Sequence, residues 1–269
     1  MSQKKAIKKE HYVSQFYLKK FTYDGYRLFV FDKFVKETFP SNIRDIAGEN
    51  HFYDLPDDFV DKNTDPQIVE KALAVFEDDF SVWINDALKN INNEKRISPK
   101  LRVHLSLFLT IQMLRTREAR NFQIEAVEKL SKSFLDFAVQ QARPDISPKD
   151  YQIEYDPKKT PLLQASQIFD LETVGTFAEV LYNHIWLIGK NGTKQPFYTS
   201  DNPVVKNAHK RAIGIASEGV EIAFPLTPNL ILILRERSFF KKLKGLDSTV
   251  IPLSEDNVTY YNSLQVIDS

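Results

Sequence analysis

The stretch from Ser98 to Ala142, SPKLRVHLSLFLTIQMLRTREARNFQIEAVEKLSKSFLDFAVQQA, contains no glycine and no proline after Pro99. Serine followed by proline is a helix-start signal, because serine caps a helix and proline fits its first turn. The sequence therefore predicts one unbroken helix over Leu101–Ala142. At about 1.5 Å per residue it would be about 60 Å long, so we expect its end to overhang the domain or to form a dimer.

A second helix is expected just before this stretch. Asp65 and Pro66 form a helix start, and the apolar residues that follow keep the i, i+3, i+4, i+7 spacing of a core-facing surface. This spacing predicts a helix from about Pro66 to Asn90. Its apolar stripe consists of Val69, Leu73, Phe76, Phe80, Trp83, Ile84 and Ala87. The two helices would form a long helical hairpin in the middle of the chain.

Strands are expected on both sides of the hairpin. An Asp24-Gly25 turn precedes the aromatic and branched run Tyr26–Lys33, which predicts a strand paired with residues 12–21. After a third helix, roughly Pro161 to Asn183, short apolar runs predict strands at 184–189, 195–199, 221–225 and 230–236, followed by a helix at 255–266. The fold class is α+β, with the central helical hairpin and short antiparallel strands from the N- and C-terminal parts.

The domain organisation follows from length and local composition. A chain of 269 residues fits one domain spanning 1–269. The polar segment 143–160 contains three prolines and is the best candidate for an internal boundary.

Composition excludes several classes of protein. Lys and Arg number 36 and Asp and Glu also number 36, so there is no global basic charge and nucleic-acid binding would need a local patch. The chain has no cysteine, which excludes disulfides, thiolate metal sites and cysteine nucleophiles. The longest apolar runs are about five residues, too short for a membrane span. We therefore expect no membrane association and a cytoplasmic location.

Common cofactor motifs are missing. The eight glycines never form a dinucleotide-binding or phosphate-binding loop, and the five histidines are never spaced four apart on a helix. We therefore expect no metal and no cofactor.

Two polar residues fall within the apolar stripe of the long helix. At 100° per residue, Gln112 and Arg115 lie on the same side as Phe108. A buried guanidinium needs a partner, and Glu70 or Glu77 of the preceding helix is placed to supply it. Two interpretations stay open: a structural ion pair between the helices, or residues that line a cavity.

Two further segments carry candidate functional groups. Ser200, Asp201 and Asn202 follow an aromatic strand and precede a proline, which is typical of functional strand ends but also of an Asx turn. His11 and Gln15, four residues apart, would share a face in a helix or a strand. A histidine beside a tyrosine is also common as an ordinary hydrogen-bonded residue.

These segments together resemble the bacterial and phage proteins grouped as the domain of unknown function 4238 family. The opening signature of that family is matched by His11-Tyr12-Val13, Gln15-Phe16-Tyr17-Leu18 and Phe21, with Ser14 in place of the usual proline. Later matching blocks are Glu49 with Phe52-Tyr53, then Glu70, Leu73 and Glu77, then Gln112 with Arg115 and Arg117, then Thr199–Val204, Pro225–Pro228 and Asn262–Gln265. The resemblance implies that these polar residues act together, but it supplies no reaction.

Two hypotheses of different class follow. The first is an enzyme acting on a phosphate-containing substrate, a nucleotide or nucleic acid, with His11 as general acid or base. In it Glu49 or Asp201 orients the histidine and Arg115 and Arg117 bind phosphate. The remaining substrate-binding candidates are Gln15, Gln112, Ser200 and Asn202. The second is a non-catalytic binding or regulatory protein that forms a homodimer through the apolar stripe in the C-terminal half of its long helix, which consists of Ile124, Val127, Leu130, Phe134, Phe137 and Ala138.

Overall fold

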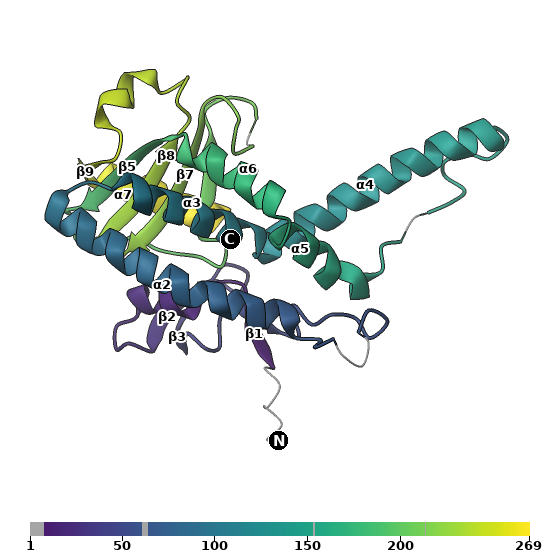
Figure 1. Ribbon diagram of the computed structural model, residues 1–269, viewed down its shortest axis with the longest axis horizontal. Helices are drawn as coiled ribbons and strands as arrows, with labels where there is room; N and C mark the ends of the chain where they lie inside the picture. Colours follow the sequence, from purple (N-terminus) through teal and green to yellow (C-terminus); the bar gives the residue numbers. More distant parts are fainter. Residues whose placement is uncertain (1–7, 61–63, 153, 213) are drawn as a thin grey trace.

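Five strands in the C-terminal part of the chain form the main sheet of this computed structural model (Figure 1). The structure describes residues 8–60, 64–152, 154–212 and 214–269. The strands are β5 (Ile185–Asn191), β6 (Val205–Ala208), β7 (Val220–Thr227), β8 (Leu230–Arg235) and β9 (Thr249–Leu253). Their order is β6-β7-β8-β5-β9, and all neighbours are antiparallel except β5 and β9, which are parallel. The expected runs at 184–189, 221–225 and 230–236 are confirmed as strands.

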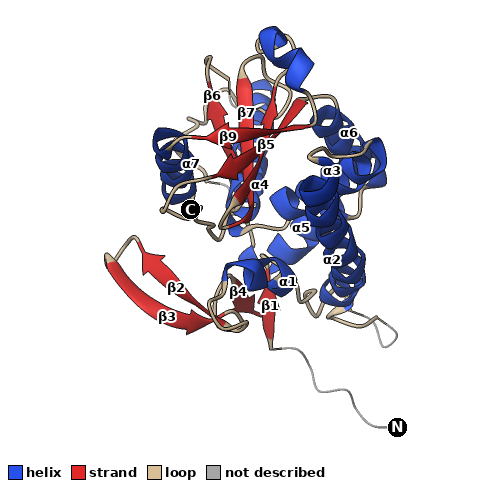
Figure 2. Cartoon of the chain, turned by 90° about the vertical axis from the view of Figure 1, so that its left-hand side faces the viewer, coloured by secondary structure: helices blue, strands red, loops and turns tan. Residues whose placement is uncertain are grey.

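Both faces of this sheet are buried, so the sequences of its central strands are nearly continuous runs of apolar residues. One face carries Trp186, Phe224 and Leu232 in the main core. The other face packs against α7 (Glu255–Ile267), whose Val258 and Tyr261 lie in a second cluster. Figure 2 shows α7 on one side of the sheet and α2 (Ile68–Glu94), α3 (Pro99–Leu114) and α6 (Leu171–Tyr182) on the other.

The N-terminal region forms two small sheets. Strand β1 (Lys9–His11) pairs with β4 (Gly48–Asn50), and β2 (Arg27–Asp32) pairs with β3 (Glu37–Asn42). The expected strand over 12–21 is wrong, because β2 pairs with the segment directly after its own turn. Residues 12–21 instead contain a short helix, α1 (Gln15–Leu18), and a 3-10 turn, η1 (Lys19–Phe21).

The expected strand at 195–199 is also wrong. Its backbone is held by hydrogen bonds outside any sheet, from Phe197 N to Pro228 O (2.9 Å) and from Tyr198 N to Asn262 Oδ1 (2.8 Å). The α7 side chain of Asn262 therefore takes the place of a neighbouring strand.

The central helices differ from the single long helix that was expected. Helix α2 (Ile68–Glu94) packs against α3 (Pro99–Leu114), but the chain then breaks and α4 (Arg117–Ala142) starts anew. The break occurs at Thr116, which has an extended backbone and accepts a hydrogen bond from Ala119 N at 3.2 Å. Threonine is a favourable N-cap, and this local capping ends the expected helix over Leu101–Ala142.

A similar cap divides the third expected helix. Asp170 lies between α5 (Thr160–Ile168) and α6 (Leu171–Tyr182), and its side chain accepts a hydrogen bond from Glu172 N at 3.1 Å. The apolar spacing of residues 161–183 continued through this break, which is why the sequence pattern did not show it.

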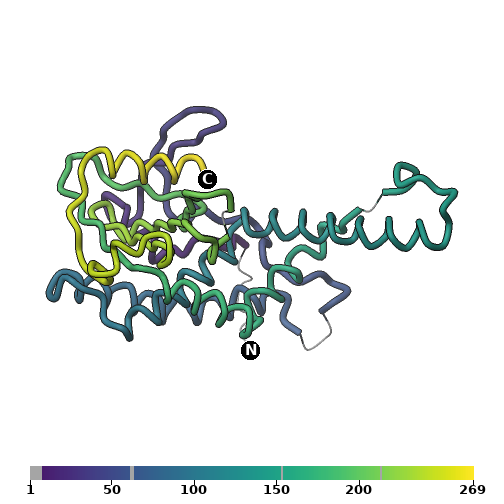
Figure 3. The backbone as a smooth tube through the Cα atoms, turned by 90° about the horizontal axis from the view of Figure 1, so that it is seen from above, coloured from purple at the N-terminus to yellow at the C-terminus, as the bar shows by residue number. Residues whose placement is uncertain are grey.

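Helix α4 projects from the rest of the molecule (Figures 1 and 3). The chain then returns along it, with hydrogen bonds from Tyr151 to Asp136 (2.6 Å) and from Lys132 to the Pro148 carbonyl (2.8 Å). The expected overhang is therefore present, although it belongs to a separate helix. The polar segment 143–160 forms this return, which leads through η2 (Pro157–Lys159) into α5.

No helix in the described part of the chain is long and apolar enough to cross a membrane. The remaining regular element is η3 (Lys241–Leu246), a 3-10 turn before β9.

Candidate functional site

Most of the residues singled out in the sequence lie around the segment that joins β1 to α1. Gln112 Nε2 donates to the Tyr12 carbonyl at 2.9 Å, and Arg115 donates to the His11 carbonyl. The side chain of Gln15 contacts His11. The structure therefore brings together residues from distant blocks of sequence.

The His11 imidazole is fully engaged by its neighbours. Its Nε2 lies 3.2 Å from the Arg44 carbonyl, and its Nδ1 lies 3.3 Å from Gln15 Nε2. These contacts assign the proton to Nε2 and make Nδ1 the acceptor from the amide. Burial lowers the pKa of His11, partly offset by the Arg44 carbonyl, so the ring is neutral. Both nitrogens are thus occupied, which disfavours His11 as a general acid or base.

Arg115 forms an ion pair inside the helical core. Its Nη1 lies 2.7 Å from Glu77 Oε1 and 2.9 Å from Ser14 Oγ, and the residue is 2 % exposed. The sequence left two interpretations of Arg115 open, a structural ion pair or a cavity residue. The structure shows the ion pair, which connects α2 to the end of α3. Arg115 Nε and Gln112 Oε1 are buried without a hydrogen-bond partner in the described chain. Each unpaired buried atom costs about 1–3 kcal/mol, so these residues are constrained by more than stability.

Ser200 and Asn202 hold the C-terminal helix. Ser200 Oγ donates to Gln265 Oε1 at 2.9 Å, and Asn202 Nδ2 donates to the Asp268 carbonyl at 3.1 Å. Asp201 lies between them, half-buried. The side chains of Ser200 and Asn202 therefore attach the connection between β5 and β6 to α7 and the residue that follows it.

Glu49 and Arg117 form a second, surface ion pair. Arg117 Nε donates to Glu49 Oε1 at 2.6 Å, and the guanidinium lies 5.7 Å from the centre of the Tyr12 ring. Burial raises the pKa of Tyr12 to about 12, and Asp201 and Glu49 add to this while Arg117 opposes it. Asp201 and Glu49 are thus close enough to act on the same phenol, at the solvent side of the cluster.

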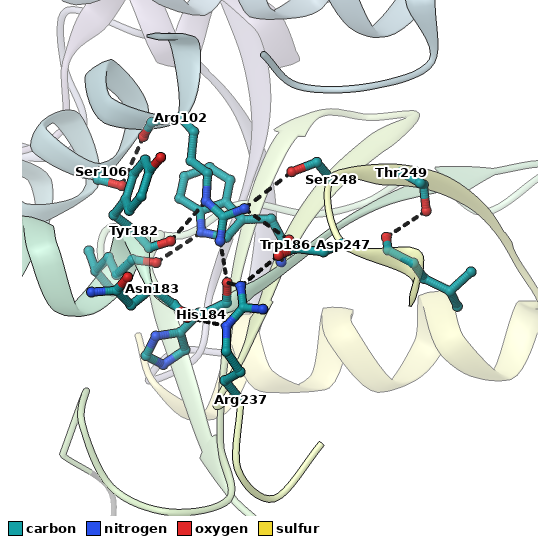
Figure 4. Close-up of polar contacts among 12 residues, drawn as sticks. Arg102, Ser106, Tyr182, Asn183, His184, Trp186, Arg237, Asp247, Ser248 and Thr249 are labelled. Atoms are coloured by element: carbon teal, nitrogen blue, oxygen red, sulfur yellow. Dashed lines mark hydrogen bonds and ion pairs between the residues drawn. The ribbon is translucent and has the colours of Figure 1, made fainter. Parts of the chain in front are cut away.

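A third arginine of these helices has a purely structural environment. Arg102 donates to the Tyr182 carbonyl (2.8 Å), Asp247 (2.9 Å) and Ser248 (3.2 Å), as Figure 4 shows. It also donates to the His184 carbonyl. Every donor group of the guanidinium is bonded, so Arg102 ties α3 to the end of α6 and to the loop before β9.

Arg120 differs from both Arg102 and Arg115. It has no carboxylate within ion-pair distance in the described part of the chain. Its Nε and Nη2 bind Gln164 Oε1 at 2.9 and 2.7 Å, and its guanidinium lies 3.3 Å from the centre of the Phe52 ring. Burial lowers the pKa of Arg120 to about 10, partly offset by Tyr53 and Glu49. Arg120 therefore remains a cation at neutral pH, held rigidly and without a counter-ion.

Arg120 lines an open groove of about 820 Å³, which we call the Arg120 groove. The loop after β4, the first turns of α4 and the start of α5 form its walls. Its lining residues are His51, Phe52, Asp54, Leu55, Pro56, Asp57, Asp58, Arg120, Ile124, Asp156, Pro157, Lys158, Thr160 and Pro161. The groove thus combines one fixed cation, an aromatic floor and several acidic groups.

His51 and Asp54 form a hydrogen-bonded pair in this groove. His51 Nδ1 lies 2.6 Å from Asp54 Oδ2, and the His51 side chain is 58 % exposed. The Nε2 of this ring makes no hydrogen bond within the described residues. His51 also has a positive φ of 58°, a left-handed conformation that histidine adopts more readily than most residues. A carboxylate that holds Nδ1 fixes the tautomer and leaves Nε2 free for proton transfer.

Glu10 lies behind this pair and is fully buried. Burial raises the pKa of Glu10 to about 8, a hydrogen bond from Tyr53 N (2.5 Å) opposes the rise, and neighbouring Asp54 adds to it. Two carboxyl groups this close do not both ionise readily. Glu10 therefore keeps its proton at neutral pH.

The residues of the Arg120 groove were not selected from the sequence. His51 and Asp54 lie in an irregular loop, where no periodicity marks them. Arg120 lies one turn beyond Arg117 on α4, and this i, i+3 spacing was the one available signal. No group of three or more histidine, aspartate or glutamate side chains in the described part of the chain is arranged to hold a metal.

One family model matches this chain. It is described as "Protein of unknown function (DUF4238)" and covers residues 9–269. No curated protein and no solved structure gives a significant match.

Proposed function

We propose a function for this chain, which belongs to the DUF4238 family of proteins of unknown function. In this proposal it is an enzyme that acts on a phosphate-containing substrate in the Arg120 groove. The observation that carries the proposal is the His51–Asp54 pair, 2.6 Å apart, in the same groove as the Arg120 guanidinium, which pairs with no carboxylate among the described residues. The sequence hypothesis of a histidine, a carboxylate and an arginine is kept, with different residues in the roles.

Arg120 is the anion-binding group in this proposal. Its Nη1 makes no hydrogen bond within the described chain, while Gln164 and Phe52 fix the plane of the guanidinium. A guanidinium held in this way loses little side-chain entropy on binding an oxyanion. Lys158 lies in the same groove and adds a second positive charge.

His51 is the proton-transfer group. Asp54 orients its ring through Nδ1, so Nε2 accepts or donates the proton at the substrate. Glu10 acts as a positioning residue, because it accepts a hydrogen bond from Tyr53 N and so holds the loop that carries His51 and Asp54.

The charge of the groove limits the substrate class. Asp57, Asp58 and Asp156 line it together with Arg120 and Lys158. Close like charges would repel a polyphosphate or a nucleic-acid backbone. The substrate that fits best is small and carries one phosphate group, such as a nucleoside monophosphate.

Hydrolysis assays test the proton-transfer role. Purified protein is incubated with p-nitrophenyl phosphate and with the common nucleoside 5′-monophosphates, and phosphate release is measured. His51→Asn should lower turnover by at least a hundredfold, and asparagine tolerates the positive φ at this position. His209→Asn, a half-exposed histidine outside the groove, is the control. Full activity of His51→Asn would disprove the assignment.

Phosphate binding tests the role of Arg120 without needing the reaction. Isothermal titration with inorganic phosphate should give binding that Arg120→Gln abolishes. The matched control is Arg143→Gln, an exposed arginine at the far end of α4 that pairs with Asp145. Equal phosphate binding by all three proteins would contradict the anion site.

A second candidate function, a binding protein that forms a homodimer, is supported by the projecting helix. Phe122, Leu130, Phe134 and Phe137 of α4 are 71 %, 61 %, 73 % and 66 % exposed. Large apolar side chains repeated along one helix favour a partner surface. A dimer would be compatible with either function.

A further inference from the structure

A second group of polar side chains lies beside the Arg120 groove, and we call it the Tyr12 cluster. It consists of Tyr12, Glu49, Arg117 and Asp201. The Tyr12 ring is buried, at 4 % exposure, and packs against Phe52 with ring centres 5.2 Å apart. Its hydroxyl reaches solvent and makes no hydrogen bond within the described residues. Phenylalanine would fill the same space, so the phenol group is available to a ligand.

Asp201 is a second group of the Tyr12 cluster without a partner. It is half-buried, and its carboxylate forms neither a hydrogen bond nor an ion pair with any described residue. The turn around it is fixed, because Ser200 and Asn202 attach it to the C-terminal helix region. Tyr17 Oη lies 2.7 Å from Thr199 Oγ1 and ties the same turn to α1. Asp201 is therefore a carboxylate held in place by its neighbours and not used by them.

The Tyr12 phenol is a hydrogen-bond donor at neutral pH. Burial, with smaller contributions from Asp201 and Glu49, raises the pKa of Tyr12 to about 12. No hydrogen bond joins the phenol to the Asp201 carboxylate in the part of the chain that the structure describes. The cluster thus offers an unpaired donor and an unpaired acceptor close to each other.

The Glu49–Arg117 ion pair lies beside the phenol. Arg117 Nε and Nη2 bind Glu49 Oε1 at 2.6 and 2.5 Å, and the guanidinium lies 5.7 Å from the centre of the Tyr12 ring. The second carboxylate oxygen of Glu49 and Nη1 of Arg117 make no hydrogen bond among the described residues. With Asp201, the cluster has two carboxylates and one guanidinium, a net charge of one negative.

The Tyr12 cluster and the Arg120 groove are joined by the Phe52 ring. Tyr12 packs against this ring, and the Arg120 guanidinium lies 3.3 Å from its centre. Arg117 and Arg120 are one turn apart on α4, which puts about 5–6 Å between their Cβ atoms. This separation is comparable to that between the phosphate and the ring hydroxyls of a pentose phosphate. A small ligand is therefore long enough to contact both places.

We propose that Tyr12 and Asp201 bind the vicinal hydroxyls of a pentose, so that the substrate of the Arg120 groove is a pentose phosphate, either free or as part of a nucleotide. The Tyr12 hydroxyl donates to a sugar oxygen, and the Asp201 carboxylate accepts from the sugar hydroxyls. The inference rests on the proposed function for the phosphate half of the ligand and on the Tyr12 cluster for the sugar half.

Other ligand groups fit the Tyr12 cluster less well. A second phosphate or a carboxylate would lie beside both Glu49 and Asp201, and the like charges would repel it. An ammonium group only donates hydrogen bonds, so the proton of the Tyr12 phenol would stay unpaired. A hydroxyl group is neutral and both donates and accepts. It satisfies the unpaired donor and the unpaired acceptor together.

Isothermal titration tests the proposal on the full-length protein with AMP, ribose 5-phosphate, 2′,3′-dideoxy-AMP and inorganic phosphate. AMP and ribose 5-phosphate should bind about tenfold more tightly than the dideoxy compound, because only they carry vicinal hydroxyls. Tyr12→Phe should weaken AMP binding about three- to tenfold, and Asp201→Asn should weaken it by about tenfold or more. Both variants should bind 2′,3′-dideoxy-AMP and inorganic phosphate as the wild type does, since neither probe has the hydroxyls.

Two substitutions of the same chemistry elsewhere in the chain are the matched controls. Tyr26→Phe changes a tyrosine that is 60 % exposed, and Asp78→Asn changes an exposed aspartate of α2. Both should bind AMP with wild-type affinity. Circular dichroism and urea unfolding check that the Tyr12 and Asp201 variants are folded.

Equal affinity of the wild type for AMP and 2′,3′-dideoxy-AMP would overturn the proposal without any variant. Variants that weaken AMP and the dideoxy compound alike would also overturn it, because the loss would not depend on the hydroxyls. Adenosine separates this inference from the proposed function. If inorganic phosphate does not bind but adenosine binds more tightly than 2′,3′-dideoxyadenosine, the anion site fails and the pentose site stands. Absence of binding by both adenosine and AMP would contradict the pentose site.

Discussion

The Glu77 carboxylate of α2 lies 2.7 Å from Arg115 Nη1 and 2.9 Å from Ser14 Oγ, and so joins two helices to the N-terminal segment. Arg115 also binds the His11 carbonyl, which fixes the path of the chain before α1. One buried ion pair therefore connects three segments that are far apart in the sequence. Removal of this ion pair should therefore weaken the packing of all three segments.

Arg115→Ala should cost on the order of 3 kcal/mol of unfolding free energy, because it removes a buried guanidinium and leaves the partly buried Glu77 carboxylate without its counter-ion. Urea unfolding of the variant measures this. Adding Glu77→Gln to the variant should restore part of the loss, because the unpaired charge is removed. Arg117→Ala, which breaks the exposed pair with Glu49, should cost less than about 1 kcal/mol and is the control. An Arg115→Ala protein of wild-type stability would contradict this assignment.

The unfolding free energy should decrease as the pH rises from about 6.5 to 8, above the range in which the histidines of lowered pKa (His11, His104 and His184) exchange protons. The pKa of Glu10 is raised to about 8 in the folded protein, mainly by burial, and that of Glu70 to about 7 for the same reason. The folded state therefore binds more protons than the unfolded state in this range, and the stability gained at low pH is lost as these groups ionise.

Urea unfolding at several pH values measures this dependence, with a slope of up to about 1.4 kcal/mol per pH unit for each proton. Glu10→Gln should flatten the curve, because the amide cannot ionise and still accepts the hydrogen bond from Tyr53 N. A wild-type curve that rises with pH over this range would show that Glu10 is ionised in the folded state.

Ser14→Pro should be better tolerated than Ser14→Ala. Ser14 has φ −59° and ψ 131°, which proline adopts without strain. Both variants lose the hydroxyl bonds to Glu77 and Arg115. Proline also reduces the entropy of the unfolded chain, which is worth about 0.4–1 kcal/mol. Thermal unfolding should therefore place Ser14→Pro above Ser14→Ala, and the reverse order would argue for strain at this position.

Light scattering at micromolar concentration should give about twice the 31.2 kDa mass of the chain. Phe134→Glu should convert the dimer to a monomer, because it puts a charge in the apolar stripe of α4. Leu171→Glu changes an equally exposed apolar residue on α6 and should leave the dimer intact. A monomeric wild-type protein would contradict the prediction that α4 forms a dimer interface.

Local patterns in the sequence predicted the regular elements whose periodicity is continuous. The apolar stripe from Val69 to Ala87 predicted α2, because a helix that buries one face has a fixed spacing of apolar residues. The apolar run that begins at Leu230 predicted β8, because a strand buried on both faces is continuously apolar. The polar residues Gln112 and Arg115 were recognised as buried for the same reason. The partner of Arg115 was narrowed to Glu70 or Glu77 by helix geometry.

What the tertiary structure decided was where helices break and which loop residues meet. Thr116 and Asp170 end helices by single side-chain hydrogen bonds, which leave the apolar spacing unchanged and are invisible to it. The Arg120 groove depends on the loop after β4 packing against α4, a contact between residues more than 60 positions apart. The sequence by itself determined the class of fold, the helix α2 and the burial of Gln112 and Arg115, because these follow from burial along one element. The site required the folded chain, because its residues share no period and are brought together only by packing.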